Sequence, residues 1–218
     1  MCGRYVAKWS KEVFEQAFKV QPPLFESYNV APTRYAPIVW QPQGQRETLE
    51  ARWGLIPKWV DKPADFKASM FNARSETLAD KASFKRPFKS QRCLVPASGF
   101  YEWQGEKGDK QPYYIHLGDD RPLAFAGLWD HWQKGDDEIT SYTIITTRPN
   151  KLMRTLHDRM PVILPEEHFD TWLDPESEGE LLEELLRPFE GELEAYKVDK
   201  RVGRTREDDP GLIEPVAE

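Results

Sequence analysis

The sequence predicts an α+β fold: a single domain over residues 1–218, with an antiparallel, barrel-like β core and flanking helices. Strand-like segments rich in aromatic and β-branched residues outnumber helix-like ones. The 18 prolines among 218 residues favour turns and short strands over a helical bundle. Hydrophobic residues make up 39% of the chain, which is enough for a sizeable core, and no repeat or linker divides it.

The N-terminal half predicts two helices and two strands. Residues 10–20 place Val13, Phe14, Ala17 and Phe18 on one face of a helix that Ser10 can cap. The segments PIVWQPQ (37–43) and TLEARWGLI (48–56) are typical of strands joined by a Gln/Gly turn. A short helix is expected over residues 76–84, with Ser75 as its cap.

The C-terminal half predicts mostly strands. They are expected at residues 92–103, 111–117, 122–132 and 141–147, with polar, hairpin-like stretches between the later ones. A helix is expected at residues 150–156. Ser177 and Glu180 form a capping-box pattern before a second helix, LLEELL. The segment LEAYKVD (193–199) returns as a strand.

Charge is distributed unevenly along the chain, whose formal net charge is −7. Residues 58–92 hold nine Lys/Arg against four Asp/Glu, whereas residues 166–194 hold twelve Asp/Glu against one arginine. Exposed charges more than about 10 Å apart are largely screened at moderate salt, so a local basic face can attract phosphate despite the global acidity. The alternative interpretation is that both stretches are ordinary solvated faces.

Cysteine usage and hydropathy bear on the compartment. The chain has two cysteines, Cys2 and Cys93, without a CxxC or HxxxH pattern, so neither a disulfide framework nor a zinc site is expected. No apolar run reaches the length of a membrane span, and charged residues interrupt the N-terminus where a signal peptide would be apolar. These observations predict a cytoplasmic protein without metal or cofactor.

The position of Cys2 directly after Met1 allows unusual chemistry. Removal of Met1 would leave an α-amine and a thiol on adjacent carbons. An α-amine with a pKa of about 8 is roughly 10% neutral at pH 7, against about 0.04% for an ordinary lysine. It can form a Schiff base with an aldehyde, and the thiol can then close a thiazolidine ring. The alternative is a cysteine packed as a small hydrophobic residue.

Other polar residues stand in patterns that suit chemistry. Asn72 and Arg74 would share one face of a strand, where an amide and a guanidinium can hold a polar, phosphate-bearing ligand. Glu102 lies between two large aromatic residues, so desolvation is expected to raise its pKa, unless it points to water. His157 lies at the end of a predicted helix, where a structural role is the alternative.

The motifs together resemble the SRAP family, the SOS-response-associated peptidase-like proteins that crosslink to abasic sites in single-stranded DNA. The matching segments occur in the family's order over nearly the whole chain: MCGRY (1–5), YNVAPT (28–33), WGLIPKW (53–59), FNARSET (71–77), RCLVPASGFYEW (92–103), AFAGLWD (124–130), IITT (144–147), LHDRMPVIL (156–164) and LIEPV (212–216). The resemblance implies a β-rich fold with a basic groove that leads to the N-terminus.

The resemblance also implies the function and the site. Cys2 would react with the abasic-site aldehyde, Asn72 would hold Cys2 and the sugar, Glu102 would shuttle protons, and His157 would favour opening of the sugar ring. The partner would be single-stranded DNA containing abasic sites, bound by a cytoplasmic monomer that associates with the nucleoid. The implied DNA contacts are Arg4, Arg74, Arg159, Pro32, Met70 and Trp103.

Three other functions remain open on the sequence. An N-terminal-nucleophile amidotransferase can also begin with MCG, and it would release ammonia from glutamine. A thiol peptidase could use Cys2, His157 and Glu102 as nucleophile, base and orienting residue. A non-covalent reader of single-stranded DNA would keep its function after Cys2→Ala and would bind with a strong dependence on salt.

Overall fold

Two β-sheets form the framework of the computed structural model, which describes residues 2–66, 70–106 and 108–216. One sheet has five antiparallel strands, in the order β12 (Glu194–Lys197), β8 (Gln111–His116), β7 (Gly99–Gln104), β1 (Tyr5–Ala7) and β2 (Ser27–Val30). The other follows the order β11 (Met160–Pro161), β10 (Asp137–Thr147), β4 (Glu47–Trp53), β3 (Tyr35–Trp40), β6 (Arg92–Ala97) and β9 (Leu123–Lys134), with β5 (Asn72–Arg74) beside β10.

The second sheet closes on itself. β9 and β10 form a long antiparallel hairpin, and β10 also pairs in parallel with β4. The strands β10, β4, β3, β6 and β9 therefore make a closed ring, which leaves these strands without an open edge. This ring, with the five-stranded sheet and a few helices, confirms the predicted α+β class and its barrel-like core.

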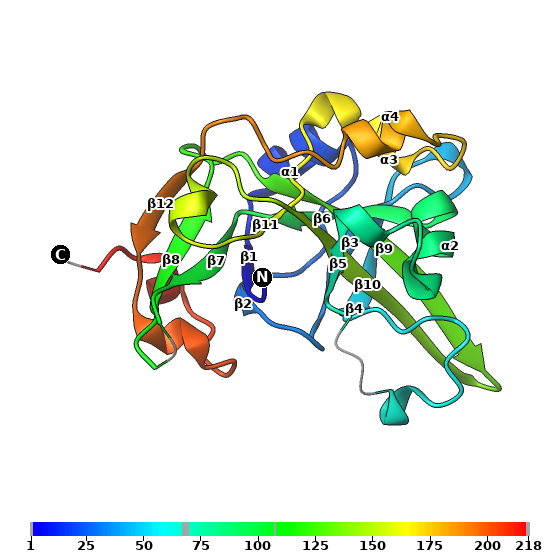
Figure 1. The fold of residues 1–218 in the computed structure, drawn as a ribbon, viewed down its shortest axis with the longest axis horizontal. Helices are drawn as coiled ribbons and strands as arrows, with labels where there is room; N and C mark the ends of the chain where they lie inside the picture. The colour runs from blue at the N-terminus through cyan, green and yellow to red at the C-terminus, as the bar shows by residue number, and fades with distance from the viewer. Residues whose placement is uncertain (1, 67–69, 107, 217–218) are drawn as a thin grey trace.

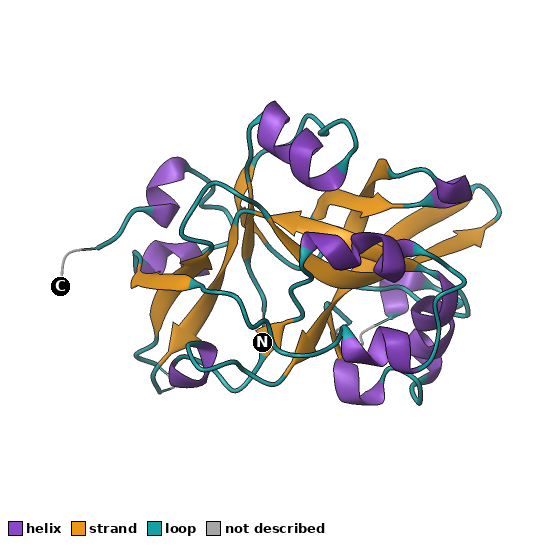
Figure 2. Cartoon of the chain, turned by 90° about the horizontal axis from the view of Figure 1, so that it is seen from above, coloured by secondary structure: helices purple, strands orange, loops and turns teal. Residues whose placement is uncertain are grey.

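The two sheets occupy opposite halves of the molecule, and the chain begins between them (Figures 1 and 2). Figure 1 shows α1, α3 and α4 along one side of the molecule and α2 beside the barrel. In the part of the chain that the structure describes, no helix has the length and apolarity that a membrane crossing needs. The α-helices are α1 (Lys11–Phe18), α2 (Ala82–Ser90), α3 (Phe169–Leu173) and α4 (Glu180–Glu184).

One hydrophobic cluster joins the sheets. Tyr5 and Phe100 enter it from the five-stranded sheet, and Trp53 and Tyr142 enter it from the barrel. Cys2 belongs to the same cluster and is fully buried. The N-terminal segment is therefore part of the core rather than a loose end.

Several local expectations are confirmed, because the signals behind them are short-range. Ser10 caps α1, since its hydroxyl accepts a hydrogen bond from the Val13 amide at 3.2 Å. The polar stretches after residues 103 and 132 join the hairpins β7–β8 and β9–β10. The expected strands at residues 111–117, 122–132, 141–147 and 193–199 correspond to β8, β9, β10 and β12.

Other expectations on secondary structure are wrong. Ser75 does not cap a helix: it begins a 3₁₀ turn, and α2 starts only at Ala82. Ser177 does not cap α4, whose N-cap is Gly179 with a positive φ of 62°. The helix expected at residues 150–156 is a single 3₁₀ turn at Met153–Thr155. The strand expected at residues 92–103 is two strands, β6 and β7, which belong to different sheets.

The C-terminal segment is fastened to β2 through one buried side chain. The Asn29 amide nitrogen, Nδ2, donates to the carbonyl oxygens of Val202, Arg204 and Glu207 at 3.2, 3.1 and 2.8 Å. Asn29 has no exposed surface. A buried donor that satisfies three carbonyl oxygens fixes the path of the tail beside the N-terminal strands.

We expect Asn29→Ala to lower the free energy of unfolding by about 2–3 kcal/mol, because a buried amide that binds three carbonyls of the tail is lost. Asn29→Asp should cost more, since its carboxylate would face the same oxygens in a buried site. Denaturant titration measures both effects, with the exposed Gln45→Ala as the control. A loss below about 0.5 kcal/mol for Asn29→Ala would show that the tail is not held by this residue.

Candidate functional site

The site begins at Cys2, whose side chain lies in the cluster between the two sheets. Burial raises the pKa of the Cys2 thiol well above its ordinary value, and the nearby Glu102 carboxylate raises it further. The thiol is therefore protonated at neutral pH. It needs a proton acceptor before it can act as a strong nucleophile.

Glu102 faces Cys2 because of the alternation of side chains along β7. Phe100 and Glu102 lie on the same side of the strand, and Phe100 packs in the cluster that contains Cys2. The residues between and after them, Tyr101 and Trp103, pack in a different cluster on the other side. The strand thus delivers a carboxyl group to the first residue of the described chain.

Burial raises the pKa of Glu102 to about 7. Only 3% of the residue is exposed. The sequence predicted a raised pKa, but for a different reason, since the flanking aromatic residues point to the opposite side of the strand. The desolvation comes instead from the core between the sheets. A carboxyl group with a pKa near 7 can both accept and donate a proton at physiological pH.

His157 approaches Glu102 from the segment after β10. The distance between His157 Nε2 and Glu102 Oε1 is 3.6 Å, slightly beyond hydrogen-bonding range. The Arg159 amide donates to His157 Nδ1 at 3.0 Å, which suits the neutral ring, whereas the Asp158 carboxylate lies 2.9 Å from the same nitrogen and suits the charged ring. Burial lowers the pKa of His157, so the neutral form prevails at pH 7.

Asn72 is held at the start of β5 with its amide group oriented. Its Nδ2 donates to the Phe71 carbonyl at 3.0 Å, and the same carbonyl accepts from Trp53 Nε1 at 2.8 Å and from the Ile144 amide at 3.1 Å. Among the described residues, no group donates to Asn72 Oδ1, which is buried. This oxygen can accept a hydrogen bond from a further group, such as an amine or a sugar hydroxyl.

Two of the arginines predicted to bind DNA, Arg4 and Arg74, differ in their surroundings. Arg4 is half-buried, and its guanidinium donates to the carbonyls of Gly3 at 2.9 Å and Gly203 at 3.3 Å. Burial lowers its pKa. Arg74 is exposed at the end of β5, two residues after Asn72, which agrees with the predicted shared face.

Arg159 is engaged within the protein. Its guanidinium forms two hydrogen bonds to the Glu76 carboxylate, at 2.6 and 2.9 Å, and one to the Thr146 carbonyl at 2.7 Å. The Arg159 side chain is only 11% exposed. Hydrogen bonds to Arg159 lower the pKa of Glu76. A phosphate would have to compete with this carboxylate, so the predicted DNA contact of Arg159 stays a prediction.

The three remaining predicted DNA contacts, Pro32, Met70 and Trp103, also stay predictions. Pro32 is half-buried in the turn between β2 and β3. Met70 is half-buried against a second hydrophobic cluster, and its carbonyl accepts from the Leu55 amide at 3.0 Å. Trp103 packs against the cluster on the far side of β7 from Glu102.

Sequence reasoning missed a pair of hydroxyl groups beneath the site. The hydroxyl oxygens of Tyr5 and Tyr142 lie 2.6 Å apart, and both tyrosines are fully buried in the cluster that contains Cys2. Burial raises the pKa of each. Tyr5 belongs to the MCGRY motif, but nothing in the sequence indicates its partner. Across residues 2–66, 70–106 and 108–216, no cluster of three His, Cys, Asp or Glu side chains is placed to hold a metal ion.

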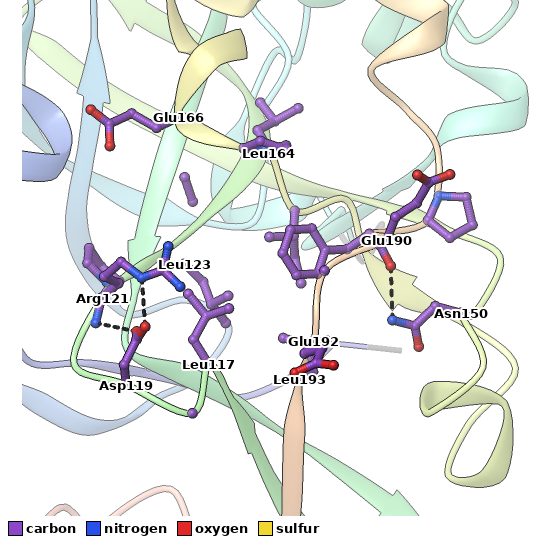
Figure 3. Close-up of a pocket in the computed structure, with 18 of the residues that line it drawn as sticks. Leu117, Asp119, Arg121, Leu123, Asn150, Leu164, Glu166, Glu190, Glu192 and Leu193 are labelled. Atoms are coloured by element: carbon purple, nitrogen blue, oxygen red, sulfur yellow. Dashed lines mark hydrogen bonds and ion pairs between the residues drawn. The ribbon is translucent and has the colours of Figure 1, made fainter.

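A separate hollow of about 1360 Å³ lies away from these residues (Figure 3). Its lining includes Leu117, Leu164 and Phe189, together with the Arg121–Asp119 ion pair at 2.8 Å. None of the predicted site residues lines it. The hollow is therefore separate from Cys2, which lies in the hydrophobic cluster between the two sheets.

Comparison with known proteins identifies the family. A family model described as SOS response associated peptidase (SRAP) matches residues 1–205. The chain belongs to the SRAP family. An SRAP relative from Bacillus subtilis strain 168, the abasic site processing protein YoqW, is 38% identical and is covered over 99% of its length by 98% of this chain. The abasic site processing protein HMCES of Gallus gallus is 33% identical over 87% of this chain and 66% of its own.

Two solved structures share the fold of this chain. A crystal structure of a protein from Bacteroides thetaiotaomicron superimposes with a TM-score of 0.88 at 29% identity, and covers 99% of this chain and 100% of its own. A protein from Bordetella bronchiseptica gives a TM-score of 0.81 at 29% identity, over 91% of this chain and 100% of its own. The two-sheet arrangement is thus shared with experimentally determined structures.

Proposed function

We propose that this chain processes abasic sites in single-stranded DNA by capturing them covalently through Cys2. The relatives named abasic site processing proteins support the substrate. The observation that carries the chemistry is the position of Glu102, a buried carboxyl group with a pKa of about 7 beside the Cys2 thiol and 3.6 Å from His157.

The reaction begins once Met1 has been removed and the Cys2 α-amine is free. The amine attacks the ring-opened sugar aldehyde to form a carbinolamine, which loses water to give an imine. The thiol sulfur then adds to the imine carbon, and its proton goes to the nitrogen, which closes a five-membered thiazolidine. The net change is the loss of one water. Glu102 takes the proton from the amine or thiol and gives a proton to the departing hydroxide.

The neighbouring residues hold and prepare the sugar. Asn72 Oδ1 accepts a hydrogen bond from the amine or from a sugar hydroxyl. His157 donates to the sugar ring oxygen and so favours the open aldehyde. Arg4 and Arg74 bind the flanking phosphates as charged forks. Abasic sites in single strands suit such a site, because no base pair has to be opened.

The raised pKa of the Cys2 thiol counts against a thiol peptidase, which needs an activated thiolate whose pKa is lowered by its surroundings. An N-terminal-nucleophile amidotransferase would use the Cys2 α-amine as its base, so release of ammonia from glutamine distinguishes it. A protein that binds single-stranded DNA without covalent chemistry does not need a carboxyl group with a pKa of about 7 beside a cysteine. The thiazolidine reaction uses both, because the amine attacks first.

Intact-protein mass spectrometry tests the proposal directly. Purified protein is mixed with a single-stranded oligonucleotide that contains one abasic site. We expect loss of Met1 and a heat-stable adduct lighter than the summed masses by one water. A protein that loses Met1 yet forms no adduct would refute covalent capture, and glutaminase and peptidase assays would then follow.

We expect His157→Ala to slow crosslinking to an ordinary abasic site by about 10²-fold, because ring opening loses its acid. The same variant should react at close to the wild-type rate with an oligonucleotide whose aldehyde is permanently open-chain. His131→Ala, in the β9–β10 hairpin, is the matched control. Equal slowing with both substrates would assign His157 a structural role or a role in a later step.

A further inference from the structure

An ion pair close to His157 joins two segments that are far apart in the chain. The Arg159 guanidinium donates to both oxygens of the Glu76 carboxylate, at 2.6 and 2.9 Å, and to the Thr146 carbonyl at 2.7 Å. The Arg159 side chain is largely buried, and its hydrogen bonds lower the pKa of Glu76, so the carboxylate is charged at neutral pH. Two parallel hydrogen bonds to a carboxylate fix both the position and the direction of a guanidinium.

The ion pair reaches across the end of β10. This strand lies between β5 and β11, and Thr146 pairs with β5 in parallel register and with β11 in antiparallel register. Glu76 follows β5 by two residues, and Arg159 lies directly before β11. The pair therefore ties the end of the strand that begins at Asn72 to the segment that carries His157.

The backbone of Arg159 contacts the ring of His157. The Arg159 amide donates to His157 Nδ1 at 3.0 Å. In a neutral imidazole one nitrogen accepts and the other carries the proton, so this bond requires the proton on Nε2. Nε2 is the nitrogen that lies 3.6 Å from Glu102 Oε1. The exposed Asp158 carboxylate lies 2.9 Å from Nδ1 and favours the opposite tautomer, with the proton on Nδ1.

We propose that Glu76 is a positioning residue for His157. By holding the Arg159 side chain, Glu76 keeps the Arg159 amide directed at Nδ1, and so keeps the His157 proton on Nε2. Without this carboxylate, the described hydrogen bonds of the Arg159 guanidinium are reduced to those with Thr146, and Asp158 competes for a proton on Nδ1. The inference rests on the proposed function for the use of the Nε2 proton, but the tautomer itself is measured without DNA.

Nitrogen NMR of isotopically labelled histidine rings tests the tautomer. Long-range proton–nitrogen spectra at pH 8 distinguish a protonated ring nitrogen from an accepting one, and the spectrum of His157→Ala assigns the signal. We expect the Nε2–H form to dominate in the wild type. Glu76→Gln should raise the ratio of the Nδ1–H form to the Nε2–H form about tenfold, because a charge-assisted contact is lost. An unchanged ratio in Glu76→Gln would overturn the inference.

The matched control is Glu184→Gln, which removes a carboxylate from the exposed ion pair between Glu184 and Arg187. It should leave both the tautomer ratio and the crosslinking rate at their wild-type values. A shift of the ratio in Glu184→Gln as large as in Glu76→Gln would overturn the inference, because the effect would then not depend on the contact with Arg159.

Crosslinking rates test whether Glu76 acts through His157. With an ordinary abasic site we expect Glu76→Gln to react about fivefold more slowly, because fewer rings carry the proton on Nε2 and the ring is less firmly oriented. In the His157→Ala background, Glu76→Gln should cause no further slowing. Equal slowing in both backgrounds would overturn the inference, since the ion pair would then act on the fold or on DNA. A wild type that forms no adduct would refute covalent capture, and the tautomer ratio would still decide the role of Glu76.

Discussion

Replacing Cys2 with alanine is expected to abolish the heat-stable adduct with an abasic-site oligonucleotide, a loss of at least about 10³-fold. Without the sulfur the thiazolidine cannot close. The alanine variant still begins with an α-amine after Met1 removal, so an imine still forms and hydrolyses. We expect sodium borohydride to reduce this imine to a stable amine. The yield of this amine adduct should be near the yield of the thiazolidine adduct in the wild type. Denaturing electrophoresis with and without borohydride measures both effects.

The control for this experiment is Cys93→Ala. Cys93 is also buried and burial also raises the pKa of its thiol, but it lies within β6 and carries no α-amine. It should crosslink like the wild type if it folds, which thermal melting verifies. A heat-stable adduct in Cys2→Ala would show that another nucleophile is at work. If Cys2→Ala gave no borohydride-reduced product either, the thiol and not the amine would be the group that attacks the aldehyde first.

The sequence was most informative where local signals decide the structure. Ser10 was assigned as a cap from its hydroxyl and the apolar residues that follow, and the cap depends only on these neighbours. The Ser177 and Glu180 pattern was just as clear, yet Gly179 took the cap position in a left-handed conformation. Such competition between adjacent caps is settled by how the helix packs, which the pattern does not contain.

At the candidate site, too, local sequence patterns did not reveal the tertiary packing around a side chain. The motifs pointed to Cys2, Glu102 and His157, and the structure brings these three together. It also shows that Glu102 is buried by the core between the sheets, although its sequence neighbours suggested the aromatic residues beside it. The alternation of a strand sends neighbours to opposite faces, so the environment of a side chain depends on the partner sheet rather than on adjacent letters.

The same reasoning explains two features of Arg159 and Thr33 that the structure shows and the sequence does not. Arg159 looked available for phosphate, but Glu76, far away in the chain, occupies it. Thr33 ends the YNVAPT motif and has a positive φ of 77°, which is invisible in a sequence unless glycine marks it. Both findings depend on contacts between distant segments.

Replacing Glu102 with glutamine is expected to have opposite effects on activity and stability. At pH 7 the variant should crosslink about 10²–10³-fold more slowly, because proton transfer to and from the amine, thiol and departing hydroxide loses its carrier. Single-turnover rates over pH 5–9 measure this loss. The wild-type rate should pass through a maximum near pH 7, since a free amine is favoured at higher pH and a protonated Glu102 at lower pH. A wild-type rate in Glu102→Gln would exclude Glu102 from the chemistry.

The stability effect follows from proton linkage. The pKa of Glu102 is about 7 in the folded protein and near its ordinary value of 4.5 in the unfolded chain, so the folded state binds more protons between pH 4.5 and pH 7. The free energy of unfolding therefore falls as pH rises through this window, by about 3 kcal/mol in total. Glutamine remains neutral, and Glu102→Gln should lose this decline and be the more stable protein at pH 8.

Denaturant titrations at pH 5 and pH 8 measure this difference, with the exposed Glu50→Gln as the matched control. An equal decline in wild type and Glu102→Gln would show that the buried carboxyl group does not change its charge in this range. The expected result would mean that the fold gives up stability at neutral pH to keep a proton carrier beside Cys2. If position 102 served only the packing of the core, an uncharged side chain of the same shape, such as glutamine, would give a more stable fold at neutral pH. The stability lost by keeping a glutamate there is therefore explained by its role in proton transfer.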